Sequence, residues 1–422
     1  MAWRNLWRNR RRTTLTLSSI AFGTMLAVLF TGMGDANFSE MIDLAAGLGG
    51  GHVSLQHPEY FDTPTLSRTI GGVHELREQA LRDPDVERVV TRIVGHMMIA
   101  SPSQSAGAAF IAFDPAQEDE TTLSVLEALS DGEMFSSADA RGIILGARLA
   151  ESLGVGLGGK VVYTLTDKEG EIVQEATRVR GILRTGAPSV DAGLSLFPIG
   201  STRKALGYAP DEAVQLGLFL GDQRRAESVA RRLAGPSKGG GLHSAGSTLG
   251  SNGRAVAALA WHELQPDLAG FIAMKVASAR FMEAIIAVLV AAGIFNTLFV
   301  SVMERMREFG VMTALGFSPA NLFGLVMWES LWLGLVGLGL GAVFTALPYW
   351  LLFTRGIDLG AQLGAGGTEV AGVAIGTVMR VDIYPENAAV IACAALLATL
   401  ASGLYPAWRA GSVEPVESIR LV

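Results

Sequence analysis

Cysteine is almost absent from this sequence of 422 residues, in which Cys393 is the only one. A single cysteine cannot form an internal disulfide or a Cys-x-x-Cys metal site, so disulfide-stapled and zinc-ribbon folds are excluded. Six histidines are scattered along the chain, and none stands in a His-Glu-x-x-His pattern or another close ligand spacing. The sequence therefore predicts no metal site and no catalytic residue.

Charged residues are scarce as well. They make up 17% of the chain, whereas soluble globular domains usually carry about a quarter. Half of the residues are hydrophobic, the mean hydropathy is +0.37, and the formal net charge of -7 argues against a nucleic-acid partner. These values indicate a protein that lies only partly in a membrane, because its long middle section is polar.

Four segments are long and apolar enough to cross a bilayer, which takes roughly 20 residues. They run from about Thr14 to Met33, Ala284 to Met303, Leu322 to Phe353 and Ala388 to Tyr405. The first follows a basic leader, as in a signal peptide, but it is longer than the 7–15 residues of a signal h-region, so we expect a retained anchor.

Arginines set the orientation. Five of them, at positions 4, 8, 10, 11 and 12, precede the first span and place the N-terminus in the cytoplasm. Four crossings return the C-terminus to the same side, with the loop Glu304–Pro319 inside and residues 35–279 outside. Cys393 is expected to be buried in the fourth span.

The outside stretch has mixed α and β character. Strand-like runs include Val89–Ala100, Lys160–Thr166 and Ile172–Leu183, and helix-like runs include Thr122–Leu129 and Ala147–Leu153. The glycine- and serine-rich run Gly235–Gly253 is expected to be a mobile loop. The predicted fold class is a membrane protein with an α-helical four-span transmembrane domain and a large external α/β (α+β) domain inserted between spans one and two. The predicted domains are residues 1–34 (amphipathic leading helix and span one), 35–279 (external domain) and 280–422 (spans two to four, a short helix at 304–319 and the tail).

The loop after the second span carries the most informative motif. A charged Glu304-Arg305-Met306-Arg307-Glu308 patch leaves the membrane, an apolar run follows, and Gly316 with Ser318-Pro319 ends it. Glycine can adopt the left-handed conformation that closes a helix, and proline prevents its continuation. We therefore expect a short amphipathic helix at the cytoplasmic surface.

The pattern V-x-E-R-x-R-E-x-G-x-x-x-A-L-G from Val302 to Gly316 resembles the FtsX/MacB/LolCE superfamily of permeases, the type VII ABC transporters. The leading segment Trp3–Thr13, the ending Tyr405–Ala410 with Glu414–Arg420, and the layout of one span, a large domain and three spans resemble that family too. Gly146–Ala150 is a looser likeness within the outside stretch.

The resemblance implies an inner-membrane permease subunit, itself not an enzyme, with its large domain in the periplasm. In this family the helix after span two couples to a partner ABC ATPase, which binds ATP and magnesium, so the permease needs no cofactor of its own. That role carries over to seven residues: Glu304, Arg305, Arg307, Glu308, Gly310, Leu315 and Gly316. A second permease protomer, identical or paralogous, is also implied.

Among family functions, the size of the external domain favours the lipoprotein-releasing LolC/LolE type, in which lipid-anchored cargo passes to a periplasmic carrier. Two alternatives stay open: efflux of peptides or antibiotics with an adaptor, and FtsX-like activation of a cell-wall hydrolase. For lipid cargo we expect a portal along span two, with candidates Phe281, Ile285, Leu289 and Phe295.

Three further features have plainer interpretations. Gly154–Val161 matches the glycines and lysine of a P-loop, but Val161 replaces the required hydroxyl, and a helix rather than a strand is expected before it. Glu329 in the third span is expected to be structural or interfacial more than a proton carrier. Gly337 and Gly341 form a Gly-x-x-x-Gly pair that favours helix packing within the chain over a specific dimer seam.

Overall fold

The computed structural model describes residues 10–234, 247–249, 255–358, 368–370, 373–375 and 378–412. Most of the leading segment Trp3–Thr13, the tail motif Glu414–Arg420 and most of the glycine-rich run Gly235–Gly253 therefore lie outside the described residues. The chain divides into two compact units. The first comprises Met1–Phe38, Ile272–Asp358 and Val378–Val422, and the second comprises Ser39–Phe271 and Leu359–Thr377.

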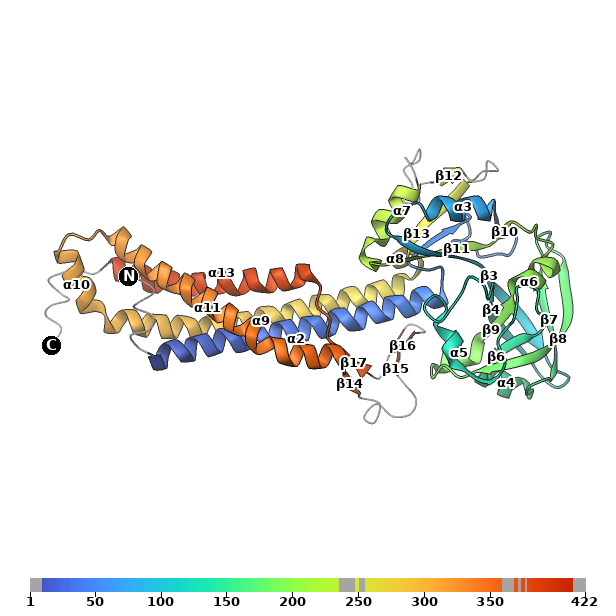
Figure 1. Cartoon of the computed structure of the whole chain (residues 1–422), viewed down its shortest axis with the longest axis horizontal. Helices are drawn as coiled ribbons and strands as arrows, with labels where there is room; N and C mark the ends of the chain where they lie inside the picture. Colours follow the sequence, from blue (N-terminus) through green and yellow to red (C-terminus); the bar gives the residue numbers. More distant parts are fainter. Residues whose placement is uncertain are drawn as a thin grey trace. The chain divides into compact units, whose positions relative to one another are not determined.

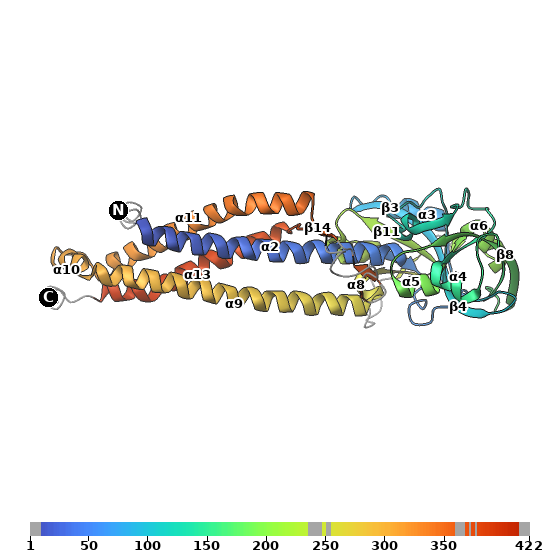
Figure 2. The same ribbon diagram turned by 90° about the horizontal axis from the view of Figure 1, so that it is seen from below.

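Long helices build the first unit, and Figures 1 and 2 show them side by side. They are α2 (Arg10–Leu48), α9 (Pro266–Glu304), α11 (Pro319–Thr354) and α13 (Pro385–Gly411), with the short α10 (Met306–Ala314) between α9 and α11. Among the described residues these four long helices are apolar enough to span a membrane, which confirms the four predicted spans. Both α2 and α9 continue into the second unit. Helix α2 extends 15 residues beyond Met33, the predicted end of span one, and α9 begins 18 residues before Ala284, the predicted start of span two. Hydropathy locates the membrane boundary, whereas backbone hydrogen bonding carries the helix beyond it.

Small residues let these helices approach closely. A Cβ atom on Gly337 would lie 2.6 Å from Cγ2 of Ile20, and one on Gly341 would lie 3.1 Å from Cβ of Thr24. Both neighbours belong to α2, so the glycine pair packs within the chain, as predicted. Cys393 is exposed on α13, and the prediction that it is buried is wrong. It lies on an exposed face of the helix, although Ile391 in the same turn is buried, because a single helix can bury only part of its circumference against neighbours.

Eleven strands of the described residues form the main sheet of the second unit. They are β1 (Val53–Gln56), β3 (Val86–Ala100), β4 (Ser105–Phe113), β5 (Leu129–Gly132), β6 (Ile143–Gly146), β7 (Lys160–Thr166), β8 (Ile172–Leu183), β9 (Leu194–Pro198), β11 (Gln215–Leu220), β12 (Ser247–Leu249) and β13 (Ala255–Ala260). The order begins β12-β13-β1-β11-β3 and continues β4-β9-β6-β8-β5, while β7 joins β8 to β3. Strands β3, β4, β9, β6, β8 and β7 thus close into a ring.

Strand β3 belongs to both halves of this sheet. Its first part, up to Arg92, pairs with β11, and its second part, from Arg92 onward, pairs with β4. Only Met98, Ile99 and Ala100 pair with β7, so the ring is narrowly closed on that side. The interior is apolar and includes Phe110, Tyr163 and Phe197, with ring centroids 5.7 and 5.0 Å from Phe197.

Short helices lie beside the sheet. They are α3 (Val73–Ala80), α4 (Ala147–Leu153), α5 (Pro188–Gly193), α6 (Ile199–Leu206), α7 (Ala226–Ala234) and α8 (Trp261–Leu264), with 3-10 turns η1 (Ser124–Ala128) and η2 (Gln223–Arg225). Two-stranded pairs join β2 (Ile70–Gly71) to β10 (Glu212–Ala213), β14 (Ile357–Asp358) to β17 (Val378–Met379), and β15 (Thr368–Val370) to β16 (Val373–Ile375).

Two sequence interpretations can be judged here. The helix expected at Thr122–Leu129 is wrong, because only a 3-10 turn forms before Leu129 pairs with β8. The rejection of the P-loop is confirmed, since α4 precedes Gly154 and β7 follows Gly159, the reverse of the strand-loop-helix order. Within the glycine-rich run, Ser247–Leu249 forms β12 on the edge of the sheet.

Candidate functional site

The turn between α9 and α11 holds the predicted short helix. Helix α10 ends at Ala314, and Gly316 follows with φ +97°, a region that favours glycine. The N–H of Phe317 donates to the carbonyl of Met312 at 3.1 Å, which closes the helix end. Ser318 then caps α11, accepting from the N–H of Asn321, and Pro319 occupies its first turn. As the sequence predicted, Gly316 thus closes the short helix, and Ser318-Pro319 begins the next one.

A buried phenyl ring fixes α10 to the bundle. Phe309 is completely buried, although it stands in a nine-residue helix at the end of the membrane unit. It packs in a cluster drawn from α9, α11 and α13, whose buried members are Val302, Leu322, Val326, Ala407 and Ala410. Because this cluster joins α10 to the three helices, α10 should move with the bundle as a rigid body.

An ion pair reinforces this attachment at the other end of α10. Nη1 of Arg305 lies 3.0 and 2.9 Å from the two carboxylate oxygens of Glu329 on α11. Nε of Arg305 lies 3.4 Å from a carboxylate oxygen of Glu308, and its guanidinium carbon is 5.1 Å from the Phe309 ring centroid. Glu329 is therefore the partner of Arg305 and has a structural role, as its position near the cytoplasmic end suggested.

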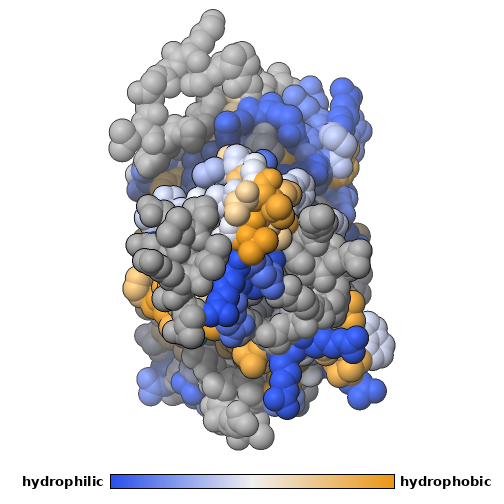
Figure 3. All heavy atoms as spheres, turned by 90° about the vertical axis from the view of Figure 1, so that its left-hand side faces the viewer, coloured by the Kyte–Doolittle hydropathy of each residue, from blue (hydrophilic) through white to orange (hydrophobic). Residues whose placement is uncertain are grey.

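The opposite side of the turn is apolar and exposed. Leu315 is 77% exposed, and Val311 and Phe317 are about half exposed. Arg307, one helical turn before Val311 on α10, is exposed as well, and so is Glu304 at the end of α9. Figure 3 faces this end of the molecule and shows a small hydrophobic area bordered by hydrophilic residues. We call Val311, Leu315 and Phe317 the apolar knob.

The structure separates the seven predicted coupling residues into two groups. Glu304, Arg307, Leu315 and Gly316 are exposed, whereas Arg305, Glu308 and Gly310 are half-buried or buried. Sequence reasoning missed Phe309, Val311 and Phe317. The helical spacing of Val311 and Leu315, four residues apart on one face, was the signal for the knob.

The four candidate portal residues lie on α9. Phe281, Ile285 and Leu289 are exposed on one face, spaced at four-residue intervals. Phe295 instead joins an aromatic cluster, with its ring centroid 5.9 Å from that of Phe299 and 6.0 Å from that of Tyr405 on α13. Their role at a portal stays a prediction.

A small cavity of about 100 Å³ lies between α2, α9 and α13, inside the first unit. Its lining is apolar except for Glu283, Thr24 and Thr399. The carboxylate of Glu283 accepts a hydrogen bond from Thr31 of α2. At its outer end α2 is also tied to α13, because Asp35 accepts hydrogen bonds from Asn387 and from the backbone N–H of Tyr384.

In the second unit, a buried arginine forms hydrogen bonds with the C-terminal end of α2. Arg92 and Glu118 are both fully buried and pair through two hydrogen bonds of 2.7 and 2.9 Å. Arg92 also donates to the carbonyls of Gly47 and Gly49, at the C-terminal end of α2, and to that of Thr122. Arg92 stands where β3 passes from β11 to β4, so this clamp joins α2, the loop after β4 and both halves of the sheet.

A second arginine of β3 holds the same loop from the surface. Arg88 donates a hydrogen bond to Asp119, which lowers the pKa of that carboxyl to about 2, and the hydroxyl of Thr121 adds to the effect. Asp119 also accepts from the backbone N–H of Thr121 and Thr122. The loop that carries Glu118 is therefore ordered by ionised groups at any physiological pH.

Metal-binding geometry does not occur in the described part of the chain. No group of three or more His, Cys, Asp or Glu side chains is placed there to hold an ion.

Comparison with known proteins places these features in a family. Residues 13–235 match the MacB-like periplasmic core domain, and residues 280–415 match the FtsX-like permease C-terminal region. The lipoprotein-releasing system transmembrane protein LolC of Xylella fastidiosa is 25% identical over 317 residues, covering 72% of this chain and 71% of that protein. LolE of Haemophilus influenzae is 24% identical over 294 residues, covering 65% and 64%. The macrolide export ATP-binding/permease protein MacB of Nitrosomonas europaea is 22% identical over 380 residues, covering 85% and 54%.

Proposed function

Because this chain belongs to the family of FtsX-like permeases with a MacB-like periplasmic core domain, we propose that it couples a separate ATPase to lipoprotein release. It is an ABC transporter permease, a multi-pass protein of the inner membrane with a periplasmic domain. The observation that carries the coupling role is the apolar knob, exposed on a short helix that Phe309 and Arg305 fix to three spanning helices.

The knob has the properties of a docking element for a soluble partner. An exposed leucine flanked by charges of both signs can enter an apolar cleft while Glu304 and Arg307 meet polar groups at its rim. ATP and magnesium would be bound by that partner. Movement of its cleft would then reach α9, α11 and α13 together, since α10 is packed on all three.

Lipid-anchored cargo gives such movement a physical purpose. Moving an acyl chain from the bilayer to water costs about 0.8 kcal/mol per methylene. An anchor with two or three chains therefore cannot leave unaided at a useful rate, and ATP-driven closure of two permease protomers would expel it. The exposed apolar face of Phe281, Ile285 and Leu289 would contact the chains before they reach a periplasmic carrier.

The matches to LolC and LolE support this cargo. A second candidate is export with a periplasmic adaptor, which the match to MacB over 85% of this chain favours. Activation of an external hydrolase is a third hypothesis. The cargo experiment below distinguishes it from lipoprotein release and from export.

Coupling is tested with Leu315→Asp in the full chain, purified with its ATPase. Leu315 is 77% exposed, so a carboxylate there should leave the fold intact and abolish docking. The control is Leu157→Asp, at an exposed leucine of the external domain, which should leave ATPase association unchanged. If the same amount of ATPase co-purifies with Leu315→Asp as with Leu157→Asp, the proposal is contradicted.

Cargo is tested by reconstituting the complex in proteoliposomes with a fluorescent lipoprotein and a soluble carrier. ATP-dependent transfer to the carrier supports lipoprotein release. If no lipoprotein leaves while a small amphiphile is exported or a hydrolase is switched on, the corresponding alternative replaces it.

A further inference from the structure

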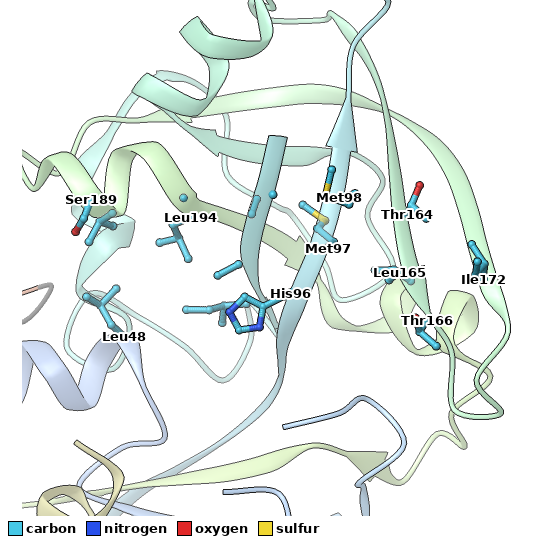
Figure 4. Close-up of a pocket in the computed structure, with 16 residues that line it drawn as sticks. Leu48, His96, Met97, Met98, Thr164, Leu165, Thr166, Ile172, Ser189 and Leu194 are labelled. Carbon is cyan, nitrogen blue, oxygen red and sulfur yellow. The ribbon is translucent and has the colours of Figure 1, made fainter. Parts of the chain in front are cut away.

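The external domain contains a cavity of about 790 Å³ that has no part in the coupling site. This volume lies within the range of small-molecule pockets in proteins, about 300–1,000 Å³. Figure 4 shows His96 of β3 between two walls, with Leu48 and Leu194 on one side and Leu165, Thr166 and Ile172 on the other. We call this cavity the ring groove, because it opens beside the strand ring.

The groove forms where the ring is weakly closed. Strand β3 pairs with β7 only from Met98 to Ala100, and beyond these residues the two strands diverge. Met97 and Leu165, which are buried in the apolar core, therefore reach the groove, together with the exposed Met98 and Ile172. On the neighbouring part of the ring, Ile111 and Leu194 belong to a core cluster that a loop covers. The groove is thus an uncovered continuation of an apolar surface.

The lining is suited to a chain without charge. His96 is the only titratable residue among the residues that line the groove, and Thr164, Thr166 and Ser189 supply the only hydroxyls. The lining also includes small residues, Gly107, Ala109 and Gly193. Their short side chains let an occupant approach the backbone closely. Methionine adapts its shape to irregular apolar partners, and Met98 is 52% exposed at the edge.

A polypeptide fits the groove less well than an alkyl chain. A bound peptide strand would need an open sheet edge to satisfy its backbone. Between the residues of β3 that pair with β11 and those that pair with β7, the hydroxyl of Tyr60 takes up one carbonyl of the edge, that of Val94, at 3.1 Å, whereas an alkyl chain needs no backbone partner at all. Burial raises the pKa of Tyr60 to about 12, so this hydroxyl keeps its proton.

We propose that the ring groove binds one acyl chain of the lipid-anchored cargo and shields it from water after it leaves the bilayer. The occupant's chemistry rests on the proposed function, whereas the existence of an alkyl-binding site does not. Leu48, the last residue of α2, lines the groove, so a membrane-crossing helix ends at this site. The hydroxyls would face the polar linkage of the chain.

Glycines allow the groove to be filled without strain. A Cβ atom on Gly193 would meet nothing within 4 Å, and one on Gly107 would meet only the sulfur of Met98 at 3.9 Å. Gly193→Trp and Gly107→Trp should each occupy the groove in a folded protein. Gly156→Trp is the matched control, because its Cβ also meets nothing within 4 Å and Gly156 lies outside the groove.

The experiment uses the full chain in nanodiscs, with the photo-crosslinking residue p-benzoylphenylalanine at Ile172. The probe is a synthetic peptide carrying a diacylglyceryl-cysteine, and the same peptide without acyl chains is the comparison. We expect crosslinks to the acylated probe only. Gly193→Trp and Gly107→Trp should lower them at least about tenfold, since each buried methylene contributes roughly a factor of four. Gly156→Trp should leave them unchanged.

Two results would overturn the inference. In the first, Gly193→Trp and Gly107→Trp are both shown to be folded by thermal unfolding, yet the acylated probe crosslinks to each of them as strongly as to Gly156→Trp. The other is equal crosslinking of the peptide without acyl chains, which would make the groove a polypeptide site. Loss of lipoprotein transfer in proteoliposomes with acyl crosslinking intact would refute the proposed function and leave the site standing.

Discussion

Gly316 shows how much one backbone conformation can decide. Its φ of +97° is unfavourable for any residue with a Cβ, and most of all for a β-branched one. Nothing lies within 4 Å of the position where that Cβ would be, so a substitution there acts through the backbone and not through a clash. We predict that Gly316→Val distorts the helix end at a cost of about 1–3 kcal/mol and lowers permease-stimulated ATP hydrolysis, while membrane insertion survives.

A matched helical glycine provides the control. Gly324 of α11 also has open space around its Cβ position and lacks a positive φ. Gly324→Val should therefore leave stimulated hydrolysis near the wild-type rate. The assignment of the turn fails if the two variants behave alike.

Asp119 gives a prediction about pH. Its pKa, lowered to about 2 by the hydrogen bond from Arg88, lies below the value of about 3.9 expected in the unfolded chain. The stabilisation is thus fully present above pH 4 and is lost as the pH falls through about 2. Arg88→Ala should lower the stability of the full chain at pH 6 by at most about 1 kcal/mol, because the pair is half exposed. Thermal unfolding of the two proteins should differ less at pH 2, where Asp119 is half protonated, than at pH 6.

Among elements, α10 depends on the pair of Arg305 and Glu329. Glu329→Gln would leave the mostly buried guanidinium of Arg305 without this carboxylate, and breaking such a pair costs about 3 kcal/mol. We predict a lower unfolding temperature in nanodiscs and weaker stimulation of the ATPase. The exchange Arg305→Glu with Glu329→Arg should recover part of both. No recovery in the exchanged protein would mean that the arginine acts through its hydrogen-bond geometry and not through the charge pair.

Variants of the Arg92–Glu118 pair can test whether α2 acts on the external domain without destabilising the fold. Buried ion pairs can often be replaced by apolar residues at little cost, whereas removing one partner is costly. The double variant Arg92→Met with Glu118→Leu should therefore fold but lose the hydrogen bonds to the end of α2. We predict near-normal ATP hydrolysis with reduced transfer of cargo. Unimpaired transfer would show that α2 acts on the domain by another route.

Elements differed in how well the sequence predicted them. Strands β7 and β8 were found with their observed bounds, and in β7 the alternating residues form one exposed and one buried face, as do those in the second half of β8. Strand β6, with the buried run Ile143–Gly146, has no alternation to detect. Arg92 and Glu118 are 26 residues apart, and charged residues are so seldom buried that neither suggested a clamp. The pairing of Arg305 with Glu329 escaped notice for a similar reason, since each had a local explanation.

For the whole molecule, the predicted membrane topology can be tested with single cysteines. Cys393 is exposed, so the background is Cys393→Ser. An impermeant maleimide should label Ser130→Cys, in the periplasmic domain, in intact spheroplasts. Ala320→Cys, beside the apolar knob, should be labelled only after permeabilisation. Equal labelling of the two before permeabilisation would refute the arrangement.

The overall organisation was easier to predict than its boundaries. Apolar runs of about 20 residues fixed the number of spans, and arginines fixed their direction. The predicted division at residues 34 and 279 remains a prediction, beside contact-based boundaries after Phe38 and Phe271. The carboxylate and hydroxyl between α2 and α9, Glu283 and Thr31, were not anticipated, because their contact joins positions 252 residues apart.

The length of α2 and α9 has a mechanical consequence. Each has 39 residues, which is about 58 Å at 1.5 Å per residue, nearly twice the roughly 30 Å of a bilayer core. Neither has a proline after its first residue, whereas α11 contains Pro348 and α13 contains Pro406. The two helices that enter the external domain are therefore the stiff ones. A stiff rod of this length that pivots by about 10° at its cytoplasmic end sweeps its far end through about 10 Å. A small tilt of either helix would thus produce a large displacement of its far end.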